Sequence, residues 1–176
     1  IQDYVFETLA DPCDISGLVL EPIQSDGGDI VPPDEYMPLL RKFCDKYGML
    51  FVDDEVKVGF GRTGKMFSIE HTGVVPDLIM MGKPMAGGMP LSAVVGRAEV
   101  LDSLPGGHAL TTGGHAVSCA AGMATVDVIG EENLLDKTQK LGDFMKRSLQ
   151  QMAESHELIG DVRGRGMIVG VELVKD

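Results

Sequence analysis

The sequence is short of the features that mark several classes of protein. It has no tryptophan, and its 15 lysine and arginine residues are outnumbered by 27 aspartate and glutamate residues, which leaves a net charge of −12. That charge disfavours a nucleic-acid backbone as a partner. No apolar run approaches the ~18–20 residues that cross a membrane, and no signal-peptide pattern is visible. We therefore expect neither a nucleic acid nor a membrane as partner.

Cysteine is also scarce. Cys13, Cys44 and Cys119 are scattered along the chain and lack the paired spacing of a metal site. An odd number of separated thiols is typical of a reducing compartment, where cysteines are buried as small apolar residues. We therefore expect a cytoplasmic protein without a metal centre.

The most informative stretch runs from Phe51 to Pro90. Two apolar runs, Met49–Val52 and Leu78–Met81, are short enough to be buried strands, and they are followed by Asp54 and Lys83 respectively. In an open α/β sheet, ligands bind at the carboxyl ends of the strands. Pyridoxal phosphate is a cofactor that needs an acid at its pyridinium nitrogen and a lysine at its aldehyde. The stretch therefore predicts a pyridoxal phosphate site.

The hydrophobic pattern around this stretch predicts an α/β fold. Gly17–Leu20 has the pattern of a buried strand, and a helix is expected from Asp34 or Glu35 to Tyr47. A strand, a crossover helix and a second strand form a βαβ unit, which favours a parallel sheet. The later elements that we expect are an antiparallel strand at Leu91–Val95, helices at Ala116–Ile129 and Glu131–His156, a turn at Val162–Gly166 and a strand at Met167–Val174.

Four blocks of sequence resemble one enzyme family, in the order in which that family has them. They are VLEPIQSDGG at 19–28, DEVKVGFGRTGKMF…GVVPDLIMMGKPMAGGMPL at 54–91, TTGGHAVSCAA at 111–121 and IGDVRGRGMIVGVEL at 159–173. These blocks are similar to the motifs of the class III aminotransferases, which are pyridoxal phosphate enzymes of fold type I. Together they cover nearly the whole chain.

The resemblance implies a fold and a domain organisation. It implies an incomplete three-layer α/β sandwich with a mostly parallel sheet, the large domain of fold-type I enzymes. Residues 1–130 are then the C-terminal half of the large cofactor-binding domain, and residues 131–176 are a connecting helix and the start of a small C-terminal domain. Family members are more than twice as long as these 176 residues, so the chain is expected to be an internal fragment.

The resemblance also implies the cofactor-binding residues. Lys83 matches the Schiff-base lysine, which serves as covalent anchor and as acid and base. Asp54 matches the acid at the pyridinium nitrogen, whereas strand alternation points its neighbour Asp53 to the opposite face. Val56 matches the apolar residue against the cofactor ring. Lys57 stands where the family usually has a glutamine that bonds the phenolic oxygen, and it is a departure from the pattern.

Two further pairs of residues complete the predicted site. Thr111, with its neighbour Thr112, matches the threonine that reaches the phosphate of the partner's cofactor across a dimer interface. A homodimer, or a dimer of dimers, with a shared active site is therefore implied. The resemblance also implies that Glu21 and Asp26 are acids on the substrate side. In omega-amino-acid enzymes of the family the Asp26 position tends to be glutamate, paired with a carboxylate-binding arginine from the C-terminal domain.

Three readings of function follow. The first is an aminotransferase that uses pyridoxal phosphate and moves an amino group from an amino acid, such as 4-aminobutyrate or another omega-amino acid, to a 2-oxo acid through Lys83. The second is an amino-acid racemase, epimerase or decarboxylase of the same family, which uses the same Lys83 and Asp54. The third is a non-catalytic fragment. In each case, the isolated 176-residue chain is expected to show no turnover.

Overall fold

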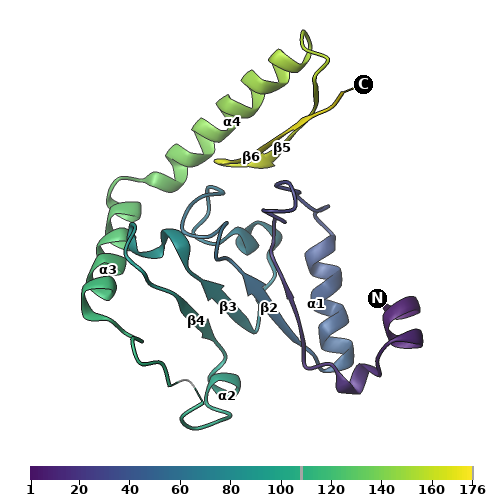
Figure 1. Ribbon diagram of the computed structural model, residues 1–176, viewed down its shortest axis with the longest axis vertical. Helices are drawn as coiled ribbons and strands as arrows, with labels where there is room; N and C mark the ends of the chain where they lie inside the picture. Colours follow the sequence, from purple (N-terminus) through teal and green to yellow (C-terminus); the bar gives the residue numbers. More distant parts are fainter. Residues whose placement is uncertain (108, 176) are drawn as a thin grey trace.

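The computed structural model describes residues 1–107 and 109–175, and its centre is a four-stranded sheet. The strands β1 (Gly17–Leu20), β2 (Leu50–Asp54), β3 (Leu78–Met81) and β4 (Ala93–Gly96) lie side by side in that order (Figure 1). The first three are parallel and β4 runs antiparallel to β3. The α/β class, the mostly parallel sheet and the antiparallel fourth strand are thereby confirmed.

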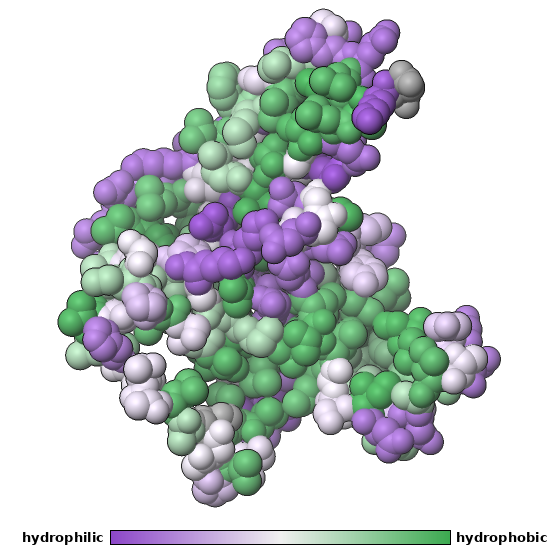
Figure 2. Space-filling view, viewed as in Figure 1, coloured by the Kyte–Doolittle hydropathy of each residue, from purple (hydrophilic) through white to green (hydrophobic). Residues whose placement is uncertain are grey.

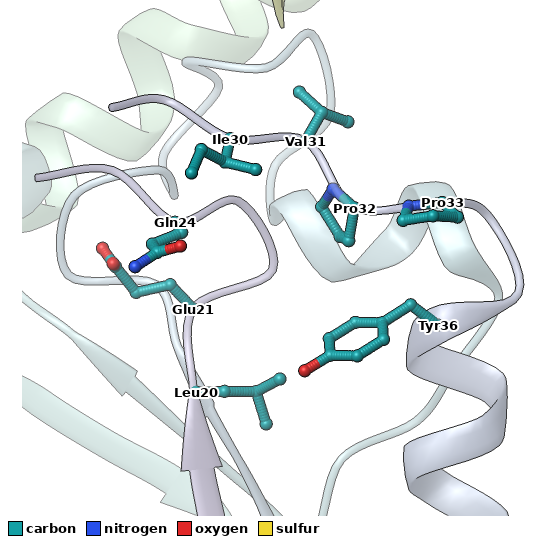
Figure 3. Close-up of a pocket in the computed structure, with 8 residues that line it drawn as sticks. All are labelled: Leu20, Glu21, Gln24, Ile30, Val31, Pro32, Pro33 and Tyr36. Carbon is teal, nitrogen blue, oxygen red and sulfur yellow. The ribbon is translucent and has the colours of Figure 1, made fainter. Parts of the chain in front are cut away.

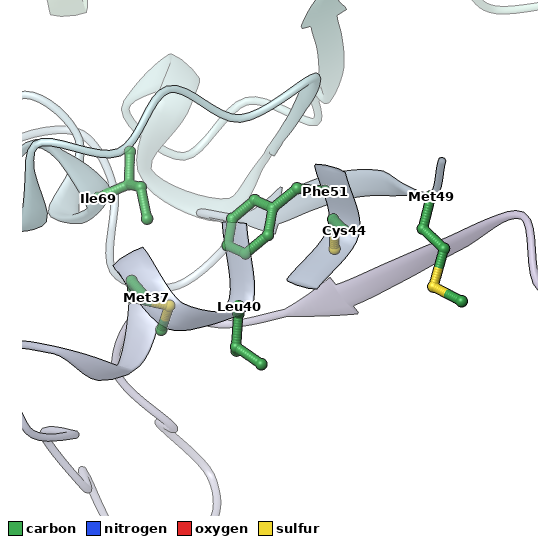
Figure 4. Packing of buried hydrophobic residues seen from close by; sticks show 6 residues of the cluster. All are labelled: Met37, Leu40, Cys44, Met49, Phe51 and Ile69. Atoms are coloured by element: carbon green, nitrogen blue, oxygen red, sulfur yellow. The ribbon is translucent and has the colours of Figure 1, made fainter. Parts of the chain in front are cut away.

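Helix α1 (Tyr36–Tyr47) connects β1 to β2 and covers one face of the sheet. It ends at Gly48, whose φ of 68° is a left-handed cap that glycine adopts without steric cost. Its apolar stripe packs on Phe51 of β2, which is fully buried (Figure 4). Fully burying each large apolar side chain of this kind stabilises the fold by roughly 1.5–3 kcal/mol. The cluster consists of Met37, Leu40, Cys44, Met49, Phe51 and Ile69.

After β4, the regular elements of the chain are helices until its last hairpin. It contains α2 (Ala98–Leu101), α3 (Ala116–Glu131) and α4 (Leu134–Ala153), followed by β5 (Ile159–Arg165) and β6 (Ile168–Leu173). Asn133, with a φ of 51°, separates α3 from α4. The shorter helical segments of the chain are a π-helical one at Gln2–Phe6 and 3-10 turns at Pro12–Asp14, Ser68–Thr72 and Lys83–Ala86.

The expected turn at Val162–Gly166 is wrong. Strand β5 continues to Arg165, and the turn consists only of Gly166 and Met167. The glycines there serve close approach within a hairpin: a Cβ on Gly164 would lie 2.0 Å from the carbonyl oxygen of Ile168. A glycine in a strand that lacks room for a side chain looks in sequence like a turn glycine.

The hairpin β5–β6 packs along α4 and reaches back to the sheet's carboxyl edge (Figure 1). The Met167 N–H donates to the carbonyl of Arg62 at 2.9 Å. A Cβ on Gly142 of α4 would lie 2.1 Å from the Gly166 oxygen, so helix and hairpin touch through backbone atoms. No helix in the described ranges is long and apolar enough to span a membrane.

Candidate active site

Asp54 and Lys83 come from the carboxyl ends of neighbouring parallel strands. Asp54 is the last residue of β2 and pairs with Met80 of β3, and Lys83 lies two residues beyond the end of β3. Parallel strands end at the same edge of a sheet, and this is the edge at which α/β folds bind ligands. The structure therefore delivers the acid and the amine to one edge, as the sequence predicted.

The face of the sheet that carries Asp54 has an open hollow. Because side chains alternate along a strand, Asp54 shares its face with Val52, Leu78 and Met80, and Asp53 points to the other face. A hollow of about 720 Å³ lies along this face, lined by Val56 and by residues of β3, β4 and α2. A flat aromatic group has room beside Val56.

The backbone around Asp54 and Lys83 is fixed by local contacts. An Asp54 carboxylate oxygen accepts from the Val56 N–H at 3.0 Å. Val56 in turn lies beside Gly82, with its Cγ1 3.5 Å from the place where a Cβ of Gly82 would be. Lys83 itself has a φ of 40°, which non-glycine residues rarely adopt. Such strain costs roughly 1–3 kcal/mol and is found most often at functional sites.

Lys57 forms an ion pair with the predicted substrate-side acid. Its ammonium lies 3.0 Å from an Asp26 carboxylate oxygen and 3.9 Å from one of Asp29. The hydrogen bond with Lys57, the charge of Lys57 and then the charge of Lys83 lower the pKa of Asp26. The same hydrogen bond raises the pKa of Lys57. Asp26, Lys57 and Lys83 thus form one charged group at the sheet edge.

The loop that carries Asp26 is held from both sides. Glu21, directly after β1, accepts from the Ser25 N–H at 3.1 Å and from the Ser25 hydroxyl. From the hairpin, Arg163 Nε donates to the Gly28 carbonyl at 2.8 Å. Gly28 has a φ of 119°, a conformation that favours glycine. The loop therefore has a defined shape, which fixes where Asp26 meets Lys57.

Glu21 directs its hydrogen bonds to Ser25, and its charge contributes to the raised pKa of Lys57. Figure 3 shows it at the end of β1, lining a hollow of about 540 Å³ that the Tyr36 ring faces from the start of α1. Neither Asp54 nor Lys83 lines this hollow. In this chain, the contacts of Glu21 shape the loop around Ser25.

Thr111 and Thr112 lie in the turn before α3. With His115, they line a hollow of about 510 Å³, which shares Ser92 and Leu110 with the hollow beside Val56. His115 begins α3 by accepting from the Ser118 N–H through its Nδ1. The two threonines are exposed and adjoin the hollow beside Val56.

One stretch of hydrophilic surface crosses the middle of the molecule. Figure 2 shows a hydrophilic band across the middle of the molecule, above the sheet in this view, and hydrophobic surface over the sheet below it. Within residues 1–107 and 109–175, no three His, Cys, Asp or Glu side chains group as metal ligands do. The arrangement suits an organic ligand with both apolar and charged parts.

Sequence reasoning gave no role to a buried acid pair beside the site. Asp53 and Glu55 are both fully buried. Burial, and then the charge of Glu55, raises the pKa of Asp53 to about 9, and burial also raises the pKa of Glu55. The run Asp53-Asp54-Glu55 was the available signal, because alternation puts acids on both faces of a strand that is buried on one.

Comparisons with known proteins match almost the whole length of this chain. A family described as aminotransferase class-III matches residues 4–176. The chain is 50% identical to a leucine/methionine racemase of Thermococcus litoralis, over 92% of this chain and 37% of the racemase. It is 43% identical to the 4-aminobutyrate aminotransferase of Escherichia coli, over 98% of this chain and 41% of that enzyme. The chain thus spans about two fifths of these relatives.

Solved structures show the same similarity in three dimensions. An amine transaminase from an uncultivated Pseudomonas species, described in its pyridoxal-phosphate-bound form, superposes with a TM-score of 0.93 at 34% identity. The match covers 99% of this chain and 41% of that one. At this identity and score, both sequence and fold support common descent.

Proposed function

Because the chain belongs to the class-III aminotransferase family, we propose that it is part of a pyridoxal-phosphate-dependent aminotransferase that moves an amino group from an amino acid to a 2-oxo acid. The observation that carries the proposal is the delivery of Asp54 and Lys83 to one sheet edge by adjacent parallel strands. The amino donor is proposed to be 4-aminobutyrate or another omega-amino acid. The 4-aminobutyrate aminotransferase among the relatives supports that class.

The residues present fit the cofactor. The hollow beside Val56 is apolar along β3 and β4, as a pyridine ring requires, and Gly82 leaves the approach to Val56 free of a side chain. Lys83 is exposed at the strand end and is therefore accessible to an aldehyde. Asp54 supplies an anion on the same face as the hollow. The donor set thus matches a group with an aldehyde, a basic ring nitrogen and a flat apolar surface.

Each residue then has a defined task. When bound, pyridoxal phosphate supplies an aldehyde that amines attack and a ring that withdraws electrons from the adjacent carbon. Lys83 would hold the cofactor through its amine and, once released by substrate, would accept and return the proton of the substrate Cα. Asp54 would keep a proton on the ring nitrogen, and Val56 would support the ring. Lys57 would donate to the ring's oxygen.

The phosphate and the substrate are assigned to the remaining residues. Thr111 and Thr112 would donate hydroxyl groups to a phosphate, and in the assembled protein that phosphate would belong to the partner of a homodimer. Asp26 would face the substrate while paired with Lys57. Glu21 would act on the substrate side by shaping the loop before Asp26.

The domain boundary and location belong to the same proposal. Residues 1–130 would form the C-terminal half of the large domain, with residues 131–176 beginning the small one. The break at Asn133 between α3 and α4 supports a boundary near there. The protein is proposed to work in the cytoplasm as a homodimer or dimer of dimers. The 176-residue chain alone is proposed to be inactive.

A racemase or epimerase is the second candidate. It is favoured by the 50% identity to a leucine/methionine racemase, which exceeds the 43% identity to the 4-aminobutyrate aminotransferase. Both reactions begin with loss of the Cα proton to Lys83, and they differ in where the proton returns. A decarboxylase of the same family would break a different bond with the same residues.

One experiment separates these activities. The full-length protein is incubated with pyridoxal phosphate, an amino acid and a 2-oxo acid, and the amounts of all four substrates and products are followed. An aminotransferase consumes one 2-oxo acid for each amino group transferred. A racemase changes the enantiomer ratio without consuming any 2-oxo acid, and a decarboxylase releases carbon dioxide. Consumption of no 2-oxo acid with every amino donor tried would contradict the proposal.

A further inference from the structure

Two acidic side chains share the buried face at the end of β2. Asp53 is the fourth residue of the strand, and Glu55 is the first residue after it. Both are 0% exposed, although an isolated ionised carboxylate is among the costliest groups to bury. They lie on the face opposite Asp54, so they take no part in the site described above.

The hydrogen bonds of this pair do not balance if both groups are ionised. One Glu55 oxygen accepts from the Ile69 N–H at 2.8 Å. Among the described residues, the other Glu55 oxygen and both Asp53 oxygens are buried without a partner. The two side chains lie on the same face, two residues apart, and each alters the pKa of the other. Two carboxylates can only accept, so a bond between them requires a proton.

We propose that Asp53 and Glu55 share one proton, which Asp53 carries, and that this bond holds the turn that presents Asp54, Val56 and Lys57. The second part of this proposal, that the bond holds the turn, rests on the proposed function, because the turn carries residues that would bind the cofactor. Asp53 and Glu55 are positioning residues, since they act through the backbone of the turn.

The surroundings decide which group carries the proton. Glu55 has backbone donors from the start of the Ser68–Thr72 turn, which favour its ionised form, whereas Asp53 has none. The charged groups that act on the pair are Asp54 on Asp53 and Glu70 on Glu55, and both are acidic. Both charged neighbours therefore oppose a second negative charge, and because the backbone donors serve Glu55, the proton stays with Asp53.

The pair sits at the base of the turn that it would hold. The Glu55 N–H donates to the Met80 carbonyl at 2.9 Å, and the Glu55 carbonyl accepts from the Gly59 N–H at 3.0 Å. A Cβ on Gly59 would lie 3.3 Å from the free Glu55 oxygen, so the side chain lies under the turn. Ionising Asp53 would place two repelling charges below Asp54 and Val56 and loosen their backbone.

The shared proton is tested by infrared spectroscopy of the full-length protein. At neutral pH, we expect the C=O stretching band of a protonated carboxylic acid, lost in Asp53→Asn and unchanged in Asp45→Asn, an exposed acid on α1. The band should vanish as the pH is raised into the alkaline range. No such band in the wild type, or a band unchanged in Asp53→Asn, would overturn the shared proton. Titration of the wild-type band does not depend on the variant folding.

The positioning role is tested by retention of pyridoxal phosphate against pH, measured by dialysis and absorbance. Asparagine at 53 still donates to Glu55 but does not ionise, so Asp53→Asn should retain the cofactor at least tenfold better than wild type above the alkaline midpoint. Asp53→Ala should retain it poorly at every pH. If the infrared band is present and the alkaline limit is unchanged in Asp53→Asn, the positioning role is wrong. If the wild type binds no cofactor, the proposed function fails while the band still tests the shared proton.

Discussion

Buried acids at the two edges of the sheet have pKa values shifted in opposite directions. At the amino edge, Asp77 accepts from Arg41 and from the Phe51 N–H, both at 2.7 Å, and from Arg97 at 2.9 Å. Burial raises its pKa, but these bonds outweigh burial and lower the pKa to about 2. At the carboxyl edge, Asp53 is more deeply buried and has no such donors, and its pKa is raised. The number of hydrogen-bond donors around each carboxyl group, more than the depth of its burial, therefore decides whether it is ionised.

This difference indicates that the amino edge contributes to stability and the carboxyl edge to chemistry. The amino edge has its central charge fully paired, as a structural ion-pair network requires. The carboxyl edge holds a lysine with a φ of 40°, two buried acids without a basic partner among the described residues, and an ion pair between Lys57 and the exposed Asp26. Arrangements of that kind persist where function requires them. Substitutions at the two edges should therefore have different consequences.

The largest expected effect is on activity, at the carboxyl edge. Replacing Lys83 by alanine removes the amine that would bind the cofactor and move the proton, so turnover should fall by at least about 10³-fold. The melting temperature of the protein without cofactor should change little, because Lys83 is exposed. Turnover and melting are measured on the full-length protein. Lys65→Ala, in the loop after β2, is the matched control, and equal losses in both variants would contradict the role of Lys83.

The amino edge should show the reverse. Asp77→Ala leaves the Phe51 N–H without an acceptor and Arg41 with only the exposed Asp45, and should lower the free energy of unfolding by about 3 kcal/mol. At a temperature where the variant is folded, turnover should be close to wild type. Denaturant unfolding measures the loss. Asp45→Ala removes the other, exposed partner of Arg41 and should cost less than about 1 kcal/mol. A larger loss in Asp45→Ala would reverse our reading of this edge.

A smaller effect concerns acid stability. Asp77 has a pKa of about 2 in the folded protein against about 3.9 when unfolded, so it stabilises the fold fully above the unfolded value. That stabilisation, about 2 kcal/mol, should be lost as the pH falls through the folded pKa. Asp77→Asn should flatten the acid side of the curve of unfolding free energy against pH. An unchanged acid side in Asp77→Asn would show that other carboxyl groups cause acid unfolding.

The smallest expected effect is at Lys57. Replacing it by glutamine removes a positive charge proposed to lie near the cofactor's anionic oxygen, and so favours the protonated form of the bound cofactor. The pH midpoint of its absorption change should rise, by under about one unit given the exposure of the site. The absorbance of the bound cofactor against pH measures this. A midpoint that falls, or a change equal in Lys65→Gln, would place Lys57 away from the cofactor.

Much of the fold could be predicted because the spacing of apolar residues and the positions of glycine and proline agreed with the elements of the structure. Gly17–Leu20 and Leu78–Met81 are strands with the predicted bounds, and the first helix ends at Gly48 as its cap indicates. The hairpin at 159–173 was partly missed, because a strand glycine that permits close approach of β5 to β6, such as Gly164, is indistinguishable in sequence from a turn glycine. The contact of the turn with α4, between Gly166 and Gly142, joins residues far apart in sequence, which local patterns do not report.

For the site, the sequence predicted which strands carry the key residues and at which edge of the sheet they lie. Strand order and alternation were enough to bring Asp54 and Lys83 to one edge and to direct Asp53 away. The Lys57–Asp26 ion pair was not foreseen, because it joins a loop after β1 to a loop after β2. The bond between Glu21 and Ser25 was also not foreseen, although the two residues are close in sequence. It depends on the shape of the loop, and that shape is held by the distant Arg163, which donates to the Gly28 carbonyl. The roles of these residues in catalysis stay predictions.

The most direct test of the central claim is chemical. The full-length protein is mixed with pyridoxal phosphate, the lysine–cofactor bond is fixed by borohydride reduction, and the modified peptide is identified by mass spectrometry. We predict one pyridoxyl group, on Lys83, with cofactor affinity lowered in Asp54→Ala. A label on another lysine, or none at all, would contradict the claim that the tips of β2 and β3 form the cofactor site.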